Sequence, residues 1–379
     1  MKKLVCLWGA PMTFRIQRVK QMLLKLESRG EINNSMVYLT PIFAVGLTLI
    51  TGFFFFAAMG ADPLEALYTF FVLPVTSSYG ISEMLVKATP IVLCAIGLSM
   101  GFKANVWNIG AEGQLILGSI TGGAMALAFY EVDSPLLLPA MMISGIIGGA
   151  VWAAVPAFLK TKWNANEILV SLMLTYVAIL ILSVMVHGPL RDPEGFNFPE
   201  SRLFHDAALL PIIWDGTSLH MGALIAVFVV IAAWIMITRH IIGFQIRVIG
   251  MAPRAAAYAG FKGKRIIWFT LLLSGGLAGL AGTFEVAGPF GQLVPSIPQG
   301  YGFTAIIVAF LGRLHPVGIL LAGILMALTY LGGETAQIEL NMPSAITGVF
   351  QGMLLFYLLA CDVLIKFRVR LVKPAASKA

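Results

Sequence analysis

The residues of this 379-residue chain that could do chemistry are the polar side chains that interrupt its long apolar runs. The first group lies in 105–119, NVWNIGAEGQLILGS, where amide and carboxyl side chains stand among three glycines. An asparagine in a turn and a carboxylate near a helix N-terminus both stabilise exposed backbone N–H groups. These residues could therefore close a tight helix turn, or could offer hydrogen bonds to a polar molecule. The residues concerned are Asn105, Asn108, Glu112 and Gln114.

A second polar segment is 163–175, WNANEILVSLMLT. Asn164 or Asn166 could cap a helix that begins there, with Glu167 in its first turn. A carboxylate at that position is favoured by the helix dipole. A structural role therefore explains most of this segment.

Further ionisable and amide residues occur late in the chain. Glu285 follows the small-residue run SGGLAGLAG (274–282), which favours close helix packing. Gln292 lies in the charge-free stretch after it, and Arg313 follows a short apolar run. An ionisable group at such a depth is a candidate for function, although Glu285 could also be a carboxylate at an interface that reaches solvent.

The segment 239–265 is basic, and within it PRAAAYAG predicts a short helix that starts after Pro253 and stops at Gly260. Its alanines would present a surface that another protein could approach closely, and they offer little apolar bulk for membrane insertion. An interfacial helix held by anionic lipid is the alternative. The residues of this predicted contact surface are Gly250, Pro253, Arg254, Ala255, Ala256, Ala257, Tyr258, Ala259 and Gly260.

Catalytic motifs are absent from the sequence. It contains no HExxH, no GxSxG and no Walker A pattern GxxxxGK[ST]. The three cysteines, Cys6, Cys94 and Cys361, are far apart and form no metal-ligand spacing. We therefore predict a protein that is not an enzyme and that needs neither a metal nor a cofactor.

The elements that must position these residues are indicated by composition. Hydrophobic residues make up 59% of the chain and charged residues 11%, whereas soluble domains average roughly 45–50% and about 25%. The net charge of +7 falls in short tracts between apolar runs, as in membrane loops, and not in a pattern for nucleic acid. The composition predicts an all-α, polytopic membrane helix bundle.

A membrane span needs about 20 apolar residues. Ten candidates occur, and the eighth is too short to cross alone, so we expect a broken helix beside a polar path. The predicted spans are 37–58, 85–102, 113–130, 136–159, 167–187, 220–238, 265–286, 301–312, 316–333 and 344–365.

Charge placement supports ten spans with both termini in the cytoplasm. That arrangement puts 22 of the 25 Lys and Arg residues on the inner side, with Arg191 and Arg202 outside and Lys87 at the outer start of a span. We predict a cytoplasmic N-terminal segment (1–36) containing an amphipathic helix over 13–30, a transmembrane domain (37–365) and a basic tail (366–379). The outer loop 188–219 is either a solvated loop or a docking surface.

Four segments together resemble the permease subunits of bacterial ABC importers of the branched-chain amino acid, ribose and nucleoside group. NIGAEGQ (108–114) is the most specific, and NEILVSLML (166–174), IGMAPRAAAYAG (249–260) and FTAIIVAFLGRLHPVG (303–318) complete the order. The resemblance covers roughly residues 37–365 and is greatest to nucleoside permeases of the basic-membrane-protein type. Thr175 and Trp107 depart from that pattern, in which Asn and Phe are common.

The resemblance implies a permease subunit in the bacterial cytoplasmic (inner) membrane. Its partners would be an ABC ATPase, a second permease that is homologous or identical, an external solute-binding protein and membrane lipid. The surface around 249–260 would then be the helix that couples to the ATPase. Path candidates are Asn105, Asn108, Glu112, Gln114, Glu285, Gln292 and Arg313.

Three functions remain to be weighed. The first is the permease of an ATP-driven importer for nucleosides, with sugars and amino acids as other solutes that such a path could carry. A stand-alone ion-coupled transporter would need ionisable groups near mid-span, and these are almost absent. A membrane scaffold would need no polar path. The first function fits best.

Overall fold

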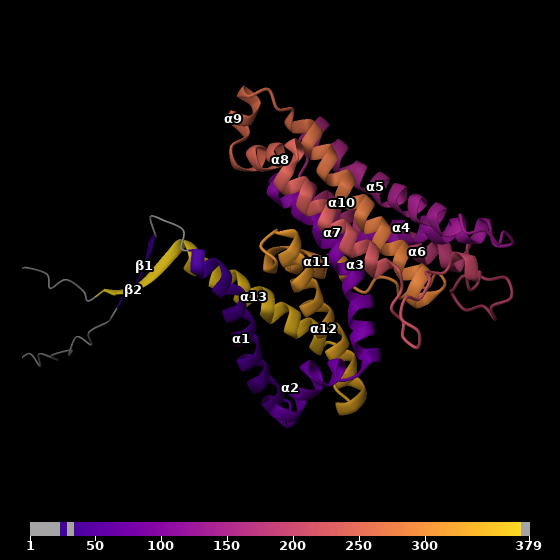
Figure 1. Ribbon diagram of the computed structural model, residues 1–379, viewed down its shortest axis with the longest axis horizontal. Helices are drawn as coiled ribbons and strands as arrows, with labels where there is room; N and C mark the ends of the chain where they lie inside the picture. Colours follow the sequence, from indigo (N-terminus) through magenta and orange to yellow (C-terminus); the bar gives the residue numbers. More distant parts are fainter. Residues whose placement is uncertain (1–22, 29–33, 373–379) are drawn as a thin grey trace, which may run out of the picture.

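The computed structural model describes residues 23–28 and 34–372 of the chain, and the fold is a helix bundle (Figure 1). Each of the ten predicted spans corresponds to a helix. These helices are α1 (Asn34–Ala58), α3 (Ser78–Lys103), α4 (Ala111–Ala128), α5 (Leu137–Trp163), α6 (Glu167–His187), α7 (Gly222–Arg239), α10 (Gly263–Glu285), α11 (Tyr301–Leu311), α12 (Pro316–Leu340) and α13 (Ile346–Lys366). Seven of them are long and apolar enough to cross a membrane, and α4, α11 and the described part of α13 are the others.

Several short elements connect these spans. They are α2 (Pro63–Phe71), a 3-10 turn at Leu73–Val75, a second at Asp206–Ala208, α8 (Ile241–Met251), α9 (Pro253–Tyr258) and a π-helical turn at Val286–Phe290. The helix predicted after Pro253 is therefore confirmed as α9. Helices α2 and α8 were not expected from the sequence, because each is too short to form a span.

The two ends of the described chain meet in a two-stranded antiparallel ribbon. Strand β1 (Leu23–Ser28) pairs with β2 (Phe367–Val372), with Leu23 opposite Val372. The amphipathic helix predicted for 13–30 is therefore wrong over 23–28, and its remaining residues lie outside the described ranges. Because the strands pair directly, both ends of the membrane domain lie on one side. We call this the terminal side and the opposite one the loop side.

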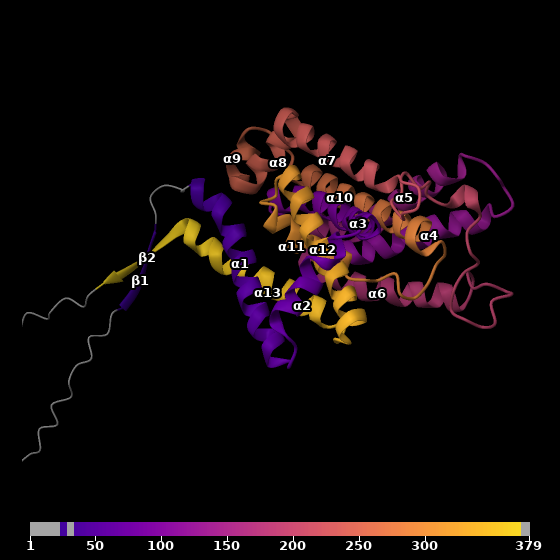
Figure 2. The same cartoon turned by 60° about the horizontal axis from the view of Figure 1, so that its bottom comes forward.

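Helix α3 forms the centre of the bundle and is buried along almost its whole length. Figure 2 shows α7, α8 and α9 along one edge and α6 along the other, with α3 and α10 between them. Helices α1, α2 and α13 form a separate layer, joined by stacked rings such as Phe70 and Phe350, whose centroids are 4.6 Å apart.

Glycines set the packing of α4, α5 and α10. A Cβ added at Gly118 on α4 would lie 2.2 Å from the Cα of Gly279 on α10, and one at Gly149 on α5 would lie 2.1 Å from the carbonyl oxygen of Gly275. No side chain fits at these separations, so the backbones touch. The expected small-residue face at 274–282 thus forms the contact among three helices.

Two boundaries differ from the predicted ones by seven residues each, more than any other. Helix α12 continues to Leu340 instead of stopping at 333, and α3 begins at Ser78 instead of 85. Glu83 and Glu334, which are outside the predicted spans 85–102 and 316–333, therefore lie within helices. The extra turns contain these charged side chains, which lower the apparent hydropathy, and Glu334 pairs with Lys87 of α3 as described below.

Candidate functional site

The turn between α3 and α4 holds a closed network of amide groups. The Nδ2 of Asn108 donates to Gln114 Oε1 at 2.9 Å and to Ser274 Oγ at 3.0 Å. Its Oδ1 accepts from the backbone N–H of Gly110 at 3.0 Å and from Gln114 Nε2 at 3.1 Å. Ser274 lies midway along α10, so the turn reaches into the interior of the bundle. Asn108 and Gln114, both predicted path residues, therefore satisfy each other's hydrogen-bonding groups.

Asn105 begins this turn in a left-handed conformation, with φ 56°. Its side-chain oxygen accepts a hydrogen bond from the indole N–H of Trp107 at 3.0 Å. An asparagine tolerates this backbone region better than most residues. The predicted turn role of the segment is thereby explained.

The carboxylate of Glu112 joins two helix N-termini. Glu112 lies in the first turn of α4 and is buried. Its oxygens accept from the backbone N–H groups of Gly300, at 2.8 Å, and Gly302, at 2.6 Å, where α11 begins. The dipoles of both helices favour a negative charge at this position, and no Lys or Arg of the described ranges forms an ion pair with Glu112. A Cβ at Gly302 would lie 2.2 Å from the Glu112 nitrogen, so glycine is required there.

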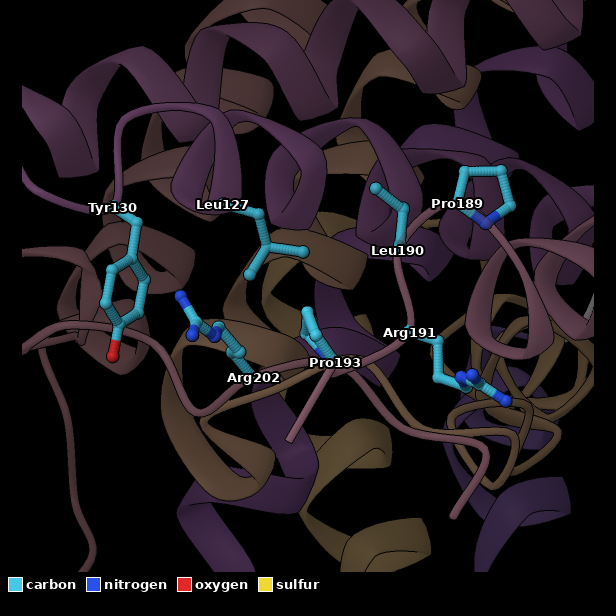
Figure 3. A pocket seen from close by; sticks show the side chains of 7 residues that line it. All are labelled: Leu127, Tyr130, Pro189, Leu190, Arg191, Pro193 and Arg202. Atoms are coloured by element: carbon cyan, nitrogen blue, oxygen red, sulfur yellow. The ribbon is translucent and has the colours of Figure 1, made fainter. Parts of the chain in front are cut away.

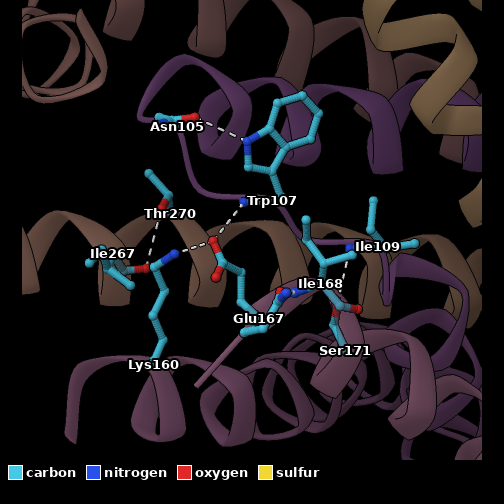
Figure 4. A network of polar contacts seen from close by, with 10 residues as sticks. Asn105, Trp107, Ile109, Lys160, Glu167, Ile168, Ser171, Ile267 and Thr270 are labelled. Carbon is cyan, nitrogen blue, oxygen red and sulfur yellow. Dashed lines mark hydrogen bonds and ion pairs between the residues drawn. The ribbon is translucent and has the colours of Figure 1, made fainter. Parts of the chain in front are cut away.

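The second sequence segment packs directly on the first (Figure 4). Glu167 accepts from the backbone N–H of Trp107 at 3.3 Å and forms an ion pair with Lys160. Ser171 Oγ accepts from the N–H of Ile109 at 3.1 Å. Asn166 caps α6 through the N–H of Ile168, whereas Asn164 ends α5 in a left-handed conformation. The two polar segments are therefore one structural unit.

Glu285 differs from the residues above because no hydrogen bond to its carboxylate occurs within the described part of the chain. It lies at the end of α10, is 4% exposed, and interacts electrostatically with Lys87 on α3. Lys87 Nζ forms an ion pair with Glu334 of α12 at 2.9 Å. A buried carboxylate normally requires a partner, so Glu285 is a candidate for a functional role.

Polar side chains from α11, α12 and α13 form a connected group that reaches Glu285 through Tyr301, whose ring centroid lies 5.2 Å from that of Tyr330. Tyr301 on α11 interacts electrostatically with Glu285 and donates to Gln299 Oε1 at 3.1 Å. Thr304 lies 2.8 Å from the Tyr330 hydroxyl and donates to Gln351 Oε1 at 3.2 Å. We call Lys87, Glu285, Tyr301, Thr304, Tyr330, Glu334 and Gln351 the polar cluster. It joins α3, α10, α11, α12 and α13.

The remaining two predicted path residues lie elsewhere. Gln292 donates to Glu200 at 3.2 Å, which ties the loop side of the bundle to the 188–219 loop. Arg313 lies after α11 on the terminal side and hydrogen-bonds Thr40 of α1. The seven candidates therefore occupy four places, with Asn105, Asn108, Glu112 and Gln114 together.

Most of the polar cluster was missed in the sequence. Tyr301, Thr304, Tyr330 and Gln351 are single polar residues in otherwise apolar helices, which have little weight in a hydropathy pattern. Helix length is the property that includes the two charged residues. Helix α3 has 26 residues and contains Lys87, and α12 has 25 residues and contains Glu334.

Helix α9 projects from the terminal side, and its exposed face is the predicted contact surface (Figure 1). Tyr258 is 98% exposed, and Met251 just before the helix is 85% exposed. Arg254, Ala255 and Ala257 are exposed as well. Ala256 is the exception because it is buried against the bundle. The segment from Met251 to Tyr258 thus presents two large side chains to solvent, and the buried Ala256 holds it against the bundle.

The 188–219 loop is fastened to the bundle and contains a cavity (Figure 3). The N–H groups of Ser201, Phe204 and Leu210 donate to carbonyl groups of the 287–293 segment at 2.8–3.0 Å. The cavity of about 140 Å³ is lined by Leu127, Tyr130, Pro189, Leu190, Arg191, Pro193 and Arg202.

Arg202 is held in this cavity by three groups. It lies 5.4 Å from the Tyr130 ring centroid, 3.6 Å from Asp192 and 3.4 Å from Glu194. Arg191 makes no ion pair to any described residue, and Figure 3 shows it on the other side of Pro193. The loop also exposes the rings of Phe196 and Phe198. Arginine and aromatic side chains are enriched at protein interfaces.

No three His, Cys, Asp or Glu residues converge among the residues that the structure places. The polar groups above are suited to hydrogen bonding and ion pairing, and they offer no nucleophile activated by a base.

Comparison with known proteins gives a consistent result. The family described as "Branched-chain amino acid transport system / permease component" matches residues 80–359. The glucose ABC transporter permease protein TsgB13 of Haloferax volcanii is 35% identical over 91% of this chain and 93% of its own length. The nucleoside ABC transporter permease protein NupB of Lactococcus lactis is 26% identical over 91% and 95%.

A solved structure of a metal-chelate type ABC transporter in an inward-facing conformation aligns with 86% of this chain and 99% of its own, with 16% identity and a TM-score of 0.44. The family match extends from α3 into α13 and so includes the turn at Asn108, the polar cluster and α9. The chain therefore belongs to the branched-chain amino acid transport system permease family, as a multi-pass ABC transporter permease and a transport component rather than an enzyme.

Proposed function

We propose that this permease imports a neutral, hydroxyl-rich solute, most specifically nucleosides, by alternating access driven by a separate ATPase. The observation that carries the proposal is the polar cluster around Glu285, a set of hydrogen-bonding groups inside apolar spans. Tyrosine, threonine and amide side chains suit the hydroxyl groups of a sugar ring. Similarity to permeases named for nucleosides and glucose supports the same solute class.

An anionic solute is disfavoured by the charges of the site. The N–H groups of Gly300 and Gly302 at the start of α11 already donate to the Glu112 carboxylate, which also lies in the first turn of α4, so a second anion would meet this negative charge. Glu285 and Glu334 outnumber Lys87 in the cluster. Nucleosides should therefore enter, whereas nucleotides should be repelled.

The terminal side faces the cytoplasm of a bacterium in this proposal, and the chain lies in the inner membrane. The basic residues of the α8–α9 segment and of the 366–379 tail support this orientation through the positive-inside rule.

The ATPase docks on α9 and its flanks. Tyr258 and Met251 would insert into a groove of the ATPase, and the small residues Ala255 and Ala257 would allow close approach. The predicted surface is retained as Gly250, Pro253, Arg254, Ala255, Ala257, Tyr258, Ala259 and Gly260, with Ala256 as its buried anchor. In protein interfaces, a few large side chains surrounded by smaller contact residues typically contribute most of the binding energy.

The external solute-binding protein docks on the loop side, where the cavity between Tyr130 and Arg191 is exposed. Arg191 would donate to an acidic side chain of the binding protein, and Phe196 would add apolar contact. The second permease completes the membrane complex. Identification of the subunits in the purified complex distinguishes a copy of this chain from a related chain.

The test is uptake by the complete transporter in proteoliposomes. The complex is purified in mild detergent, its subunits are identified, and labelled nucleoside uptake is measured with ATP inside. We expect ATP-dependent uptake that glucose, amino acids and nucleotides inhibit weakly. Inhibition by glucose alone would reassign the solute to sugars, and uptake that persists without ATP would contradict the proposal.

The ion-coupled alternative draws on one observation, the buried carboxylate of Glu285, which forms neither a hydrogen bond nor an ion pair with any described residue. A proton- or sodium-coupled transporter would carry solute without the ATPase, and ionophores would stop it. Uptake that is insensitive to ionophores and dependent on ATP would reject this alternative.

A further inference from the structure

Lys87 lies between two carboxylates that belong to different helices. Its ion pair with Glu334 links α3 to α12 at the loop side, with the two side chains 15% and 48% exposed. Glu285 on α10 is the second carboxylate, and it is the more deeply buried. Lys87 thus forms an ion pair with Glu334 and interacts electrostatically with Glu285, with which it forms no ion pair.

The helix register independently places Glu285 beside Lys87. Helices α3 and α10 are antiparallel and touch at Gly97 and Ser274, where a Cβ on Gly97 would lie 2.8 Å from the Ser274 Cα. Eleven residues further along α10 is Glu285, and eleven residues back along α3 is Val86. Glu285 is therefore level with Lys87, in agreement with their electrostatic interaction.

The energetic imbalance indicates a second arrangement. An unpaired buried carboxylate is costly, whereas a half-exposed ion pair contributes little. In the conformation seen here, Lys87 pairs with Glu334, which is partly hydrated, and does not pair with Glu285, which is buried. A conformation in which Lys87 approaches Glu285 would reverse this assignment.

We infer that Lys87 exchanges its partner during transport, from Glu334 in the conformation seen here to Glu285 in the alternate one. The exchange releases the link between α3 and α12 on the loop side, where the path must open. This inference rests on the proposed transport cycle and adds the residues that couple helix movement to it. Lys87 acts as a positioning residue that sets the balance of the two conformations.

Cys94 provides a native reporter of that balance. It lies seven residues after Lys87, on the same face of α3, is fully buried, and interacts electrostatically with Glu285. Because Cys94 and Lys87 share one face of α3, release of the Lys87–Glu334 link would admit water along that face and expose the thiol.

The experiment measures labelling of Cys94 by a charged methanethiosulfonate reagent in the purified transporter in nanodiscs, with Cys6 and Cys361 replaced by serine. We expect Glu334→Gln to speed labelling by about two- to fivefold, because it frees Lys87 for Glu285. Glu285→Gln should slow labelling, because it leaves Glu334 as the one partner. Both variants should reduce uptake. Glu339→Gln, an exposed change on the same helix, is the matched control and should alter neither measurement.

Opposite effects of the two carboxylate variants distinguish a partner exchange from simple packing. Labelling that changes in the same direction in both variants, or in neither, would overturn the inference. Lys87→Arg should retain the balance, and Lys87→Gln should remove the difference between the carboxylate variants. Labelling does not depend on the transported solute, so absent uptake in the parent protein would count against the proposed function alone.

Discussion

Glu112 on α4 accepts a hydrogen bond from the backbone N–H of Gly302 on α11, across 190 positions of sequence. The contact joins two helices that begin inside the bundle and places one carboxylate at both positive ends. It explains why a glutamate occurs in NIGAEGQ and why α11 is able to begin inside an apolar bundle.

Glu112→Ala should destabilise the start of α11. Two N–H groups would lose a charged acceptor, at a cost of about 1.5–3 kcal/mol for each hydrogen bond. We expect a lower melting temperature in detergent and loss of uptake. Glu112→Gln should be intermediate, because it keeps an acceptor oxygen but loses the charge. If alanine melts at the parent temperature, the capping role is wrong.

The glycine contact between α4 and α10 gives a second prediction. Gly118→Ala would place a methyl group 2.2 Å from the Gly279 Cα, so the helices must separate. We expect a cost of about 1–3 kcal/mol and a reduced yield of folded protein by size-exclusion chromatography. Gly348→Ala on α13 is the control, because nothing lies within 4 Å of its added methyl group. Equal yields for the two variants would contradict this packing.

The membrane spans could be predicted from the sequence because the length and hydropathy of a segment determine whether it spans a membrane. The limits of α6, Glu167–His187, match the prediction, and α11 is the expected short helix. Both have a clear boundary signal, since Asn166 caps the start of α6 and Gly312 follows the end of α11. Strand β1 was missed because its pairing partner lies more than 300 residues away.

The candidate site was only partly predictable. The local grouping of Asn108, Glu112 and Gln114 followed from their spacing in one turn. Their partners, Ser274 and Gly302, come from other helices, and no spacing rule reveals them. Lys87 was placed at a span end, where a lysine ordinarily reaches the interface, so its pairing with Glu334 was not expected.

The coupling surface predicts different outcomes for neighbouring alanines on α9. Ala257→Asp and Tyr258→Ala alter exposed residues, so the permease should fold while its affinity for the ATPase falls about tenfold or more. Ala256→Asp would bury a charge and should instead lower the yield of folded permease. The measurement is co-purification of the ATPase beside the folded yield. Normal transport by Ala257→Asp and Tyr258→Ala would remove α9 from the coupling role.

His220 makes stability depend on pH. It lies just before α7, where burial lowers its pKa from 6.5 to about 4 despite the opposing charge of Glu83. Its Nδ1 accepts from the N–H of Gly222 at 3.2 Å, so the folded protein requires the neutral ring. Between pH 6.5 and 4 the unfolded chain binds a proton that the folded chain excludes, so stability is lost as the pH falls through this window. The expected loss from pH 8 to pH 5 is about 2 kcal/mol.

His220→Asn tests this assignment, because asparagine is able to accept the same N–H but does not titrate. We expect the variant to lose less stability than the parent when melting temperatures in detergent are compared at pH 8 and pH 5. His205→Asn is the matched control, since His205 accepts from the N–H of Ala207 in the same way with a less buried ring. It should keep the parent's pH dependence. An unchanged pH dependence in His220→Asn would show that other groups on the loop side control acid stability.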